Sequence, residues 1–315
     1  MKTHVFRFLS LTILFLALGA GYNYWNDTPG IFHRDYNVPR PSMNRHFVKV
    51  RYLIEHPDKY DAYCFGSSRV GQISFENLAN GHSYYNMTYS MGLPEDFRKD
   101  LELMLRHHVT VRQILIGLDE FSFRLDPAIV DADYYKIPYQ ENNLRTYIAY
   151  LFRTPSKPYR WESGQIYDIE NTGRVLLGNR DEAIERNPEE HRKKVATDLV
   201  DIRPGNRIPE TLEAMRQIKN ICDENNIELI VFINPIEHRT YEATNLDEFN
   251  DFKQGLAKIM PYYDFSGLNR ITTDDYYYYE PSHYRPIVGD MIIHRIFDMP
   301  KDAETDFGKY VEQAN

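Results

Sequence analysis

Two separated stretches carry the side chains that a nucleophilic serine site requires. In CFGSSRVGQ, residues 64–72, Ser67 and Ser68 follow Gly66 where an apolar stretch ends and a helical pattern begins. A serine at such a corner has an exposed hydroxyl beside a helix N-terminus, which favours developing negative charge. The sequence therefore offers a candidate nucleophile, although serines at turns also serve simply as helix caps.

A candidate base lies near the end of the chain, in YYYYEPSHYRPIVGDMII, residues 276–293. Glu280 and His283 are three residues apart there, just before an apolar helical pattern. This spacing lets the carboxylate hold one imidazole nitrogen while the other nitrogen faces outward, which is the arrangement that activates a serine. Ser68, His283 and Glu280 are the predicted nucleophile, base and orienting carboxylate.

Five short apolar runs, separated by segments of helical periodicity, must position these residues. Buried runs that alternate with helices predict an α/β fold, a three-layer sandwich around a five-stranded parallel sheet. The runs cover residues 60–66, 83–90, 113–119, 228–235 and 262–267. A charged, tyrosine-rich stretch at about 123–207 breaks the alternation, and it predicts an insertion after the third strand that covers the ligand edge of the sheet.

Ligand sites in parallel sheets lie outside the carboxyl ends of the strands. The loops at those ends supply further candidates for the site, which are Ser67, Arg69, Gly92, Gly117, Asp119, Glu120 and Asn234. Arg69 directly follows the candidate nucleophile. Its role stays open between pairing with Asp119 or Glu120, binding an anionic substrate, and forming a structural salt bridge.

The N-terminal segment is predicted to be a membrane helix. Lys2 and Arg7 precede the apolar run, and residues 5–25 would span about 31 Å as a helix, close to the ~30 Å of a bilayer core. An uncleaved anchor and a cleaved signal peptide both fit, and both would export residues 30–315. The predicted organisation is a membrane segment, residues 1–29, followed by one extracytoplasmic domain.

The composition and the motifs limit the classes of ligand and partner that we expect. The formal net charge of −9 disfavours nucleic-acid binding, which needs a concentrated basic surface. Neither a metal nor a cofactor is expected, because the sequence shows no metal-ligand spacing and no glycine-rich phosphate loop. Cys64 and Cys222 are predicted to be buried free thiols. The four tyrosines at 276–279 could form a platform for sugar rings, or they could be ordinary packing residues. If this segment is extended, side chains alternate, so two rings would be exposed and two would pack inward.

These motifs, in this order and with this strand pattern, resemble the SGNH (GDSL-like) hydrolase superfamily. Residues 66–68 stand in the places of the family's Gly-Asp-Ser block, with Ser68 third, as the nucleophile. Gly92 matches the glycine that supplies an oxyanion NH group, residues 117–120 match the Gly-x-Asn-Asp block, and residues 280–283 match Asp-x-x-His. The resemblance implies acyl-ester chemistry, with the backbone NH groups of Ser68 and Gly92 binding the oxyanion.

Two residues depart from the family pattern. Asp119 replaces the asparagine that donates to the oxyanion, and a carboxylate cannot donate unless it is protonated. Glu280 replaces an aspartate and lengthens the arm that orients His283. The first change lowers the expected hydrolase activity, while the retained serine and histidine favour an enzyme.

The N-terminal membrane segment, the GSS block and the PSHY ending are most similar to the DltD-like and alginate-O-acetylation-like branch of the family. Members of that branch are membrane-tethered exported proteins that act on acyl groups of cell-surface polymers, often beside a membrane-bound O-acyltransferase. The expected function is O-acyl transfer or deacylation on a cell-envelope polysaccharide. The competing prediction is a non-catalytic module that binds glycan or scaffolds a membrane acyltransferase.

Overall fold

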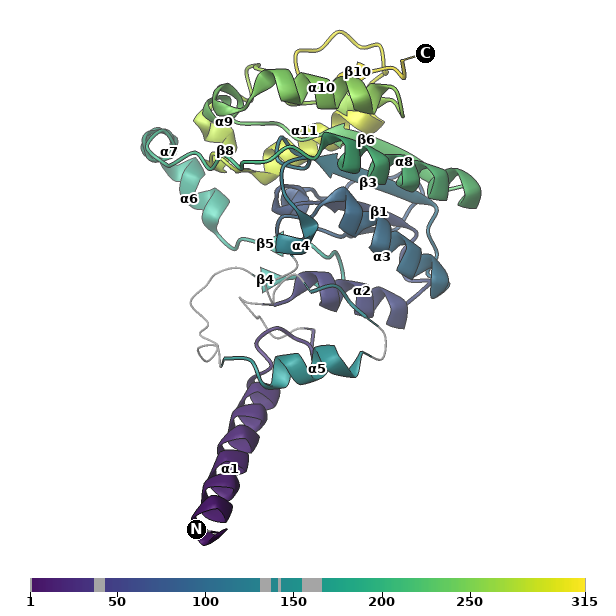
Figure 1. Cartoon of the computed structure of the whole chain (residues 1–315). Helices are drawn as coiled ribbons and strands as arrows, with labels where there is room; N and C mark the ends of the chain where they lie inside the picture. The colour runs from purple at the N-terminus through teal and green to yellow at the C-terminus, as the bar shows by residue number, and fades with distance from the viewer. Residues whose placement is uncertain (1, 37–42, 131–136, 141–142, 155–165, 315) are drawn as a thin grey trace.

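The computed structural model describes residues 2–36, 43–130, 137–140, 143–154 and 166–314 (Figure 1). A mixed six-stranded sheet forms the centre of the domain, in the strand order β10-β7-β6-β3-β1-β2. The strands are β1 (Ala62–Gly66), β2 (Tyr84–Asn86), β3 (Gln113–Leu118), β6 (Glu228–Ile233), β7 (Tyr262–Asp264) and β10 (Lys309–Val311). The α/β class predicted from the sequence is confirmed.

All five predicted strands are present and pair in parallel, whereas β10 pairs antiparallel with β7 at the edge of the sheet. The prediction of a purely parallel five-stranded sheet was therefore wrong by one strand. β10 contains only Lys309, Tyr310 and Val311, and it is too short and polar to show a buried apolar run. An edge strand needs only one neighbour, so its burial pattern is weak.

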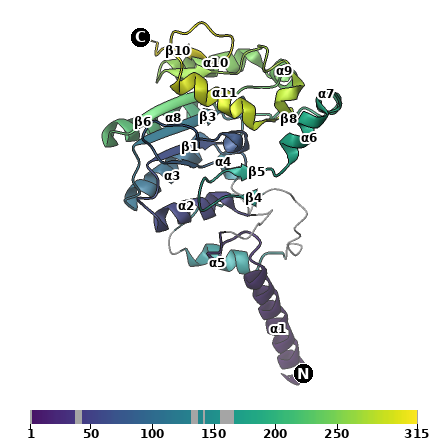
Figure 2. The same ribbon diagram turned by 180° about the vertical axis from the view of Figure 1, so that it is seen from behind.

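Helices cover both faces of the sheet (Figures 1 and 2). Side chains alternate along β1, so Tyr63 and Phe65 join the core cluster on one face while Cys64 joins the cluster on the other. The first face carries α2 (Arg45–Glu55), α3 (Pro94–Arg106), α8 (Ile208–Asn225) and α10 (Leu246–Ala257). The second face carries α11 (Pro286–Phe297), and the three layers place the carboxyl ends of the strands at one rim.

Both cysteines are free and fully buried, as predicted. Cys222 lies on α8 in the core of the first face, and Cys64 lies on β1 in the core of the second. The sheet therefore separates the two thiols.

The chain between β3 and α8 forms a set of small elements at the rim of the sheet. They are α4 (Pro127–Val130), α5 (Leu144–Leu151), the hairpin β4 (Ile166–Tyr167) and β5 (Val175–Leu176), α6 (Arg180–Arg186) and α7 (Pro188–Val195). The second half of this insertion returns to the site region, because β5 contacts η1 (Ser68–Gln72) and α7 contacts η3 (Asp275–Tyr277) and β8 (Tyr278–Glu280).

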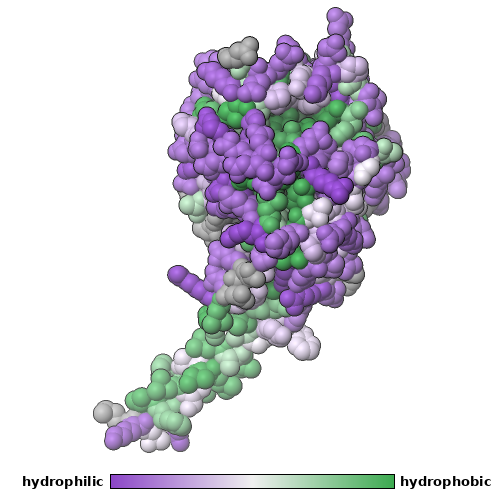
Figure 3. Space-filling view, turned by 90° about the vertical axis from the view of Figure 1, so that its right-hand side faces the viewer, coloured by the Kyte–Doolittle hydropathy of each residue, from purple (hydrophilic) through white to green (hydrophobic). Residues whose placement is uncertain are grey.

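A single long helix, α1 (Lys2–Asn26), precedes the domain. Its 25 residues span about 37 Å at about 1.5 Å per residue, and its mean hydropathy reaches 1.8. Within the described ranges, it is the one helix long and apolar enough to cross a membrane. Figure 3 shows it as a mainly hydrophobic rod that projects from a mainly hydrophilic domain. A membrane anchor and a signal sequence are both compatible with these properties.

Candidate active site

The two serines after β1 have different roles. Ser67 is fully buried, and its Oγ accepts a hydrogen bond from the backbone NH of Arg69 at 3.3 Å, which caps η1. Its carbonyl oxygen also accepts a hydrogen bond from Thr88 Oγ1 at 2.8 Å. Ser68 is the first residue of η1 and is only half-buried. Ser67 therefore fixes the corner, and Ser68 presents its hydroxyl to the surface.

The structure brings the three predicted catalytic residues together. His283 Nε2 lies 2.7 Å from Ser68 Oγ, although the two residues are 215 positions apart in the chain. His283 Nδ1 is hydrogen-bonded to Glu280 Oε1, and the other Glu280 oxygen accepts the backbone NH groups of Ser282 and His283 at 2.7 and 3.1 Å. Nucleophile, base and orienting carboxylate thus form a continuous hydrogen-bonded chain.

A two-strand hairpin sets the spacing of the base and its carboxylate. β8 pairs antiparallel with β9 (His283–Tyr284), and Glu280 is the register partner of His283. Burial acts to raise the pKa of Glu280, but its hydrogen bonds to His283 and to two backbone NH groups hold the pKa below its ordinary value. The carboxylate is therefore ionised when it orients the imidazole.

The loop after β2 brings Gly92 against the end of β1. A Cβ atom on Gly92 would lie 2.9 Å from the carbonyl oxygen of Gly66, so only glycine fits this close approach to the end of β1. Met91 has a φ of +49°, and Ser90 and Met91 line the same cavity as Ser68. The use of the Gly92 and Ser68 NH groups as oxyanion donors stays a prediction.

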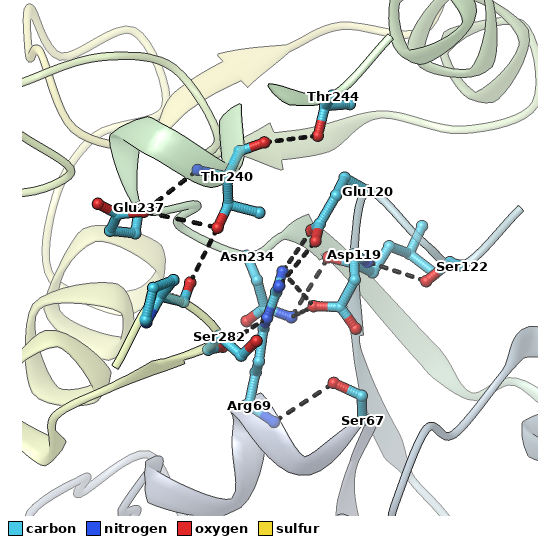
Figure 4. Close-up of polar contacts among 12 residues, drawn as sticks. Ser67, Arg69, Asp119, Glu120, Ser122, Asn234, Glu237, Thr240, Thr244 and Ser282 are labelled. Carbon is cyan, nitrogen blue, oxygen red and sulfur yellow. Dashed lines mark hydrogen bonds and ion pairs between the residues drawn. The ribbon is translucent and has the colours of Figure 1, made fainter. Parts of the chain in front are cut away.

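Arg69, which follows the predicted nucleophile in the chain, lies in a buried ion-pair cluster with Glu120 and Asp119 (Figure 4). Its guanidinium binds both oxygens of Glu120, with Nη2 2.7 Å from Oε1, and its Nη1 lies 3.2 Å from Asp119 Oδ1. Its Nε donates to the carbonyl oxygen of Ser282 at 2.7 Å. Burial acts to lower the pKa of Arg69, and the charges of Glu120 and Asp119 raise it overall. Of the three roles left open by the sequence, pairing with both carboxylates is the one observed.

Asp119 and Asn234 belong to the same cluster and lie below the cavity. Asn234 Nδ2 donates to Asp119 Oδ1 at 3.0 Å, and Asn234 Oδ1 accepts from Tyr284 Oη at 3.0 Å. Both side chains are at most 1% exposed. Burial raises the pKa of Asp119 more strongly than the charge of Arg69 lowers it. Among these predicted site residues, Glu120 lines the cavity, whereas Asp119 contacts Arg69 and Asn234 contacts Asp119.

Gly117 has a packing role. A Cβ atom there would lie 2.5 Å from Val70 Cγ1 and 2.8 Å from the ring of Phe232. Gly117 also pairs in register with Gly66 on the neighbouring strand. The absence of a side chain at both positions lets the first turn of η1 sit tightly on the sheet, which sets the height of Ser68.

Two cavities meet at Ser68 and His283. The larger has a volume of about 270 Å³ and is lined by Ser68, Arg69, Ser90, Met91, Glu120, Phe121, Asp201, Arg203, Ser282 and His283. The second, of about 130 Å³, is lined by Arg45, Ser68, Gln72, Tyr167, Val175, Leu177, Arg180, Tyr279, Glu280 and His283. Ser68 and His283 therefore line both cavities.

Several lining residues were missed from the sequence. Arg45 lies 4.8 Å above the ring of Tyr167, and Arg180 lies 4.1 Å above the ring of Tyr279. These residues come from α2, the β4–β5 hairpin, α6 and β8, and they share no spacing motif. Of these residues, only Tyr279 belongs to a pattern that could be recognised in the sequence, the run of four tyrosines at 276–279.

The tyrosine run differs from the predicted alternation. Tyr278 and Tyr279 are both buried, at 1% and 2% exposure, while Tyr276 and Tyr277 are half-buried. The reason is that Tyr276 and Tyr277 belong to the 3-10 turn η3, and the extended segment begins only at Tyr278. Two rings are thus buried and two half-buried, but they do not alternate along the chain, and a sugar contact at Tyr276 and Tyr277 stays a prediction.

Within the described ranges, one group of side chains has the composition of a metal site. The ligand atoms of Glu237, His238 and Asp275 lie within 4.8 Å of one another. Glu237 already caps α9 (His238–Ala243) and accepts from Arg239 Nε at 2.8 Å. Because its charge is already paired, this group gives no support for a bound ion.

No protein-family model matches this chain, and no curated protein matches it. The functional assignment therefore depends on the residues themselves and on their arrangement.

Proposed function

We propose that this protein is a serine-dependent acyl-transfer enzyme of the SGNH (GDSL-like) type. The observation that carries the proposal is the 2.7 Å contact between Ser68 Oγ and His283 Nε2, with Glu280 on the other imidazole nitrogen. Three residues chosen from sequence motifs meet in a half-exposed position at the carboxyl end of β1. That coincidence favours catalysis over three independent structural roles.

The reaction follows from this geometry. His283 Nε2 accepts the hydroxyl proton as Ser68 Oγ attacks an acyl-ester carbonyl and forms the new C–O bond. Collapse of the tetrahedral intermediate breaks the ester bond, and His283 returns the proton to the departing alcohol. An acceptor hydroxyl or water then attacks the acyl-serine by the same steps. Glu280 stays ionised throughout and stabilises the imidazolium.

The oxyanion would be bound by the backbone NH groups of Ser68 and Gly92. Asp119 Oδ1 accepts hydrogen bonds from Arg69 and Asn234, so an acceptor stands where the family has an amide donor. Loss of one such donor typically costs about 100- to 1,000-fold in rate. We therefore expect both the formation and the breakdown of the acyl-serine to be slow, whether the acceptor is water or another hydroxyl group.

The substrate is proposed to be an acyl ester of a cell-envelope polysaccharide or a related polymer. Two cavities that share Ser68 and His283 support transfer, because donor and acceptor can approach the acyl-serine from different sides. The five parallel strands would correspond to the SGNH core, and α1 to the anchor of the DltD-like and alginate-O-acetylation-like branch. The domain would then act outside the cytoplasmic membrane of a bacterial-type cell, with a membrane-bound O-acyltransferase as partner.

The test is covalent labelling of the full chain with a fluorophosphonate or an acyl p-nitrophenyl ester. Labelling of the wild type that is lost in both Ser68→Ala and His283→Ala would support the proposal. Ser266→Ala serves as the matched control, because Ser266 Oγ is bonded to Asp264 at 2.5 Å and lies outside both cavities. A folded wild type that stays unlabelled would contradict it.

A second candidate is a non-catalytic SGNH-fold accessory protein that binds glycan or scaffolds a membrane acyltransferase. The pairing of Arg69 with Asp119 and Glu120 favours this alternative, because a charge-paired carboxylate stands at position 119, where the family has an oxyanion donor. An unlabelled wild type that binds envelope glycan, with affinity unchanged in Ser68→Ala, would support it.

A further inference from the structure

Helix α5 exposes its most apolar face. Leu144, Ile148 and Phe152 follow one another at four-residue spacing, and they are 70%, 45% and 54% exposed. The opposite face is the more polar one, yet it is buried, with Thr146 and Tyr150 turned into the domain. A helix normally buries its aliphatic stripe, so this orientation marks a contact surface.

The buried face of α5 is held by specific contacts. Tyr150 is fully buried, and its Oη accepts a hydrogen bond from Asn44 Nδ2 at 2.8 Å. Tyr150 also packs with Phe47 of α2 and with Ile31 in a small separate core. The orientation of α5 is therefore fixed by the domain, and its apolar stripe cannot simply rotate inward.

The end of α1 is joined directly to the end of α5. Asn23 of α1 is only 6% exposed, and its Nδ2 donates to the carbonyl oxygens of Leu151 and Arg153 at 2.8 and 3.0 Å. These carbonyl groups are left without helical partners at the C-terminal end of α5. Contacts between α1 and α5 are therefore built into the fold.

The chain immediately after α1 is equally ordered. Buried Asp27 accepts the NH groups of Ile31, Phe32 and His33 at 2.7, 3.0 and 2.7 Å. Arg51 of α2 donates to the carbonyl oxygens of three residues in this turn at 2.7 to 3.1 Å. A compact joint therefore connects α1 to the domain, and Asn23 and Asp27 are part of it.

The two helices cross at a steep angle, with α5 lying across the end of α1 at the base of the domain (Figures 1 and 2). A bilayer crossed by α1 would have its surface at the level of α5. Trp25 and Tyr24 at the end of α1 are 83% and 49% exposed, as expected for side chains at a membrane interface. Exposed Arg145 lies at the edge of the stripe, where lipid phosphates would be.

We propose that α5 is an interfacial helix that lies on the outer surface of the bilayer crossed by α1, with its stripe among the acyl chains. An interfacial helix of this kind inserts its apolar face by about 5–10 Å. The occupant of the surface is lipid, because α5 contacts α1 and its end at residues 151–153 is bonded to Asn23, close to where α1 would leave the membrane. It follows that α1 is retained as an anchor and that the domain has one fixed orientation on the membrane. This proposal is independent of the acyl-transfer proposal.

The test uses a polarity-sensitive thiol probe on the full chain in lipid nanodiscs. Both native cysteines are fully buried, so a single introduced cysteine can be labelled selectively. The probe is placed at Ile148→Cys or Phe152→Cys on the stripe, and at Arg216→Cys on α8 as the water-exposed control, where the native side chain is 52% exposed. Lipids that carry a quencher on the acyl chain report contact with the bilayer.

We expect blue-shifted emission and several-fold stronger quenching at positions 148 and 152 than at position 216. Equal weak quenching at all three positions would overturn the proposal. Blue-shifted emission without lipid quenching would also overturn it and would indicate a protein on this face. The double variant Ile148→Glu/Phe152→Glu provides a second measurement, because it should keep its far-UV circular dichroism while a probe at Leu144→Cys loses its lipid quenching.

Discussion

Arg69 Nε donates to the carbonyl oxygen of Ser282, at 2.7 Å. Arg69 follows Ser68, the proposed nucleophile, and Ser282 precedes His283, the proposed base, so this bond joins the two segments that carry them. The same guanidinium is fixed from below by Glu120 and Asp119. The alignment of Ser68 with His283 therefore depends on a buried ion-pair cluster as well as on their own hydrogen bond.

Removal of the guanidinium should weaken the fold. Arg69→Ala leaves the carboxylates of Glu120 and Asp119 buried without their counter-charge, and we expect the free energy of unfolding to fall by about 3–5 kcal/mol. Urea denaturation measures this change. Arg216→Ala, on the exposed face of α8, should stay within about 0.5 kcal/mol of the wild type. In the Arg69→Ala background, Glu120→Gln should restore part of the lost free energy of unfolding, because it removes the unpaired charge. If it restores none, the coupling between the two side chains is contradicted.

The more conservative Arg69→Lys separates positioning from stability. A single ammonium group keeps the charge, but it cannot bind Glu120 and the Ser282 carbonyl oxygen with the same fork. We expect the rate of covalent labelling at Ser68 to fall by about tenfold, equivalent to about 1.4 kcal/mol. An unchanged labelling rate would show that the bond to Ser282 does not align the base.

Removal of the negative charge of Glu280 should lower the rate of covalent labelling at Ser68 while the fold is kept. Glu280→Gln keeps the size of the side chain but removes the charge that stabilises the imidazolium, and we expect the labelling rate to fall by up to about 10⁴-fold. Stopped-flow labelling measures the loss. A labelling rate equal to that of the wild type would show that Glu280 does not orient or stabilise His283.

The same carboxylate should contribute to acid sensitivity. The pKa of Glu280 is lower in the folded chain than its ordinary value of 4.5, so its contribution to stability is present above pH 4.5 and is lost as the pH falls through the folded-state pKa. We expect the free energy of unfolding of the wild type to decrease more steeply below pH 4.5 than that of Glu280→Gln. Parallel urea titrations at several pH values make the comparison, and identical slopes would contradict it.

A methyl group at position 92 should disturb the loop beside the nucleophile. In Gly92→Ala the Cβ would lie 2.9 Å from the Gly66 carbonyl oxygen, so the loop has to shift. If the Gly92 NH group binds the oxyanion, labelling should slow by about 100- to 1,000-fold. Gly267→Ala is the matched control, because a Cβ there meets no atom within 4 Å. Equal rates for the two variants would exclude a role for this loop.

Lys49 offers a test of how the loop after β2 is held. It is fully buried on α2, and its Nζ donates to the carbonyl oxygens of Asn86, Thr88 and Gly173 at 2.9, 2.7 and 2.6 Å. Lys49→Met leaves these acceptors without a donor. We expect the free energy of unfolding to fall by about 1–3 kcal/mol for each acceptor that stays unpaired. Urea denaturation and the labelling rate are the readouts. A fully stable variant would show that water replaces the ammonium group.

The sequence predicted the strands of the sheet and the proximity of Ser68, His283 and Glu280 better than it predicted the residues around them. Buried parallel strands leave continuous apolar runs, and Ser68 and His283 stand at the ends of such runs, so topology alone brings them to one rim. The pairing of Arg69 with both Asp119 and Glu120 was only one of three alternatives, because sequence spacing does not show which charges face each other. Arg45 and Arg180 reach the second cavity through tertiary packing, which leaves no local pattern.

The separation of the two thiols by the sheet has a practical consequence. Cys64 and Cys222 are fully buried in different cores, so neither can react with a thiol reagent until the structure opens on its own side. The native chain thus contains one reporter of opening for each face. The relative rates of modification at the two positions would give the order in which the layers come apart, and reducing agents would leave the folded protein intact.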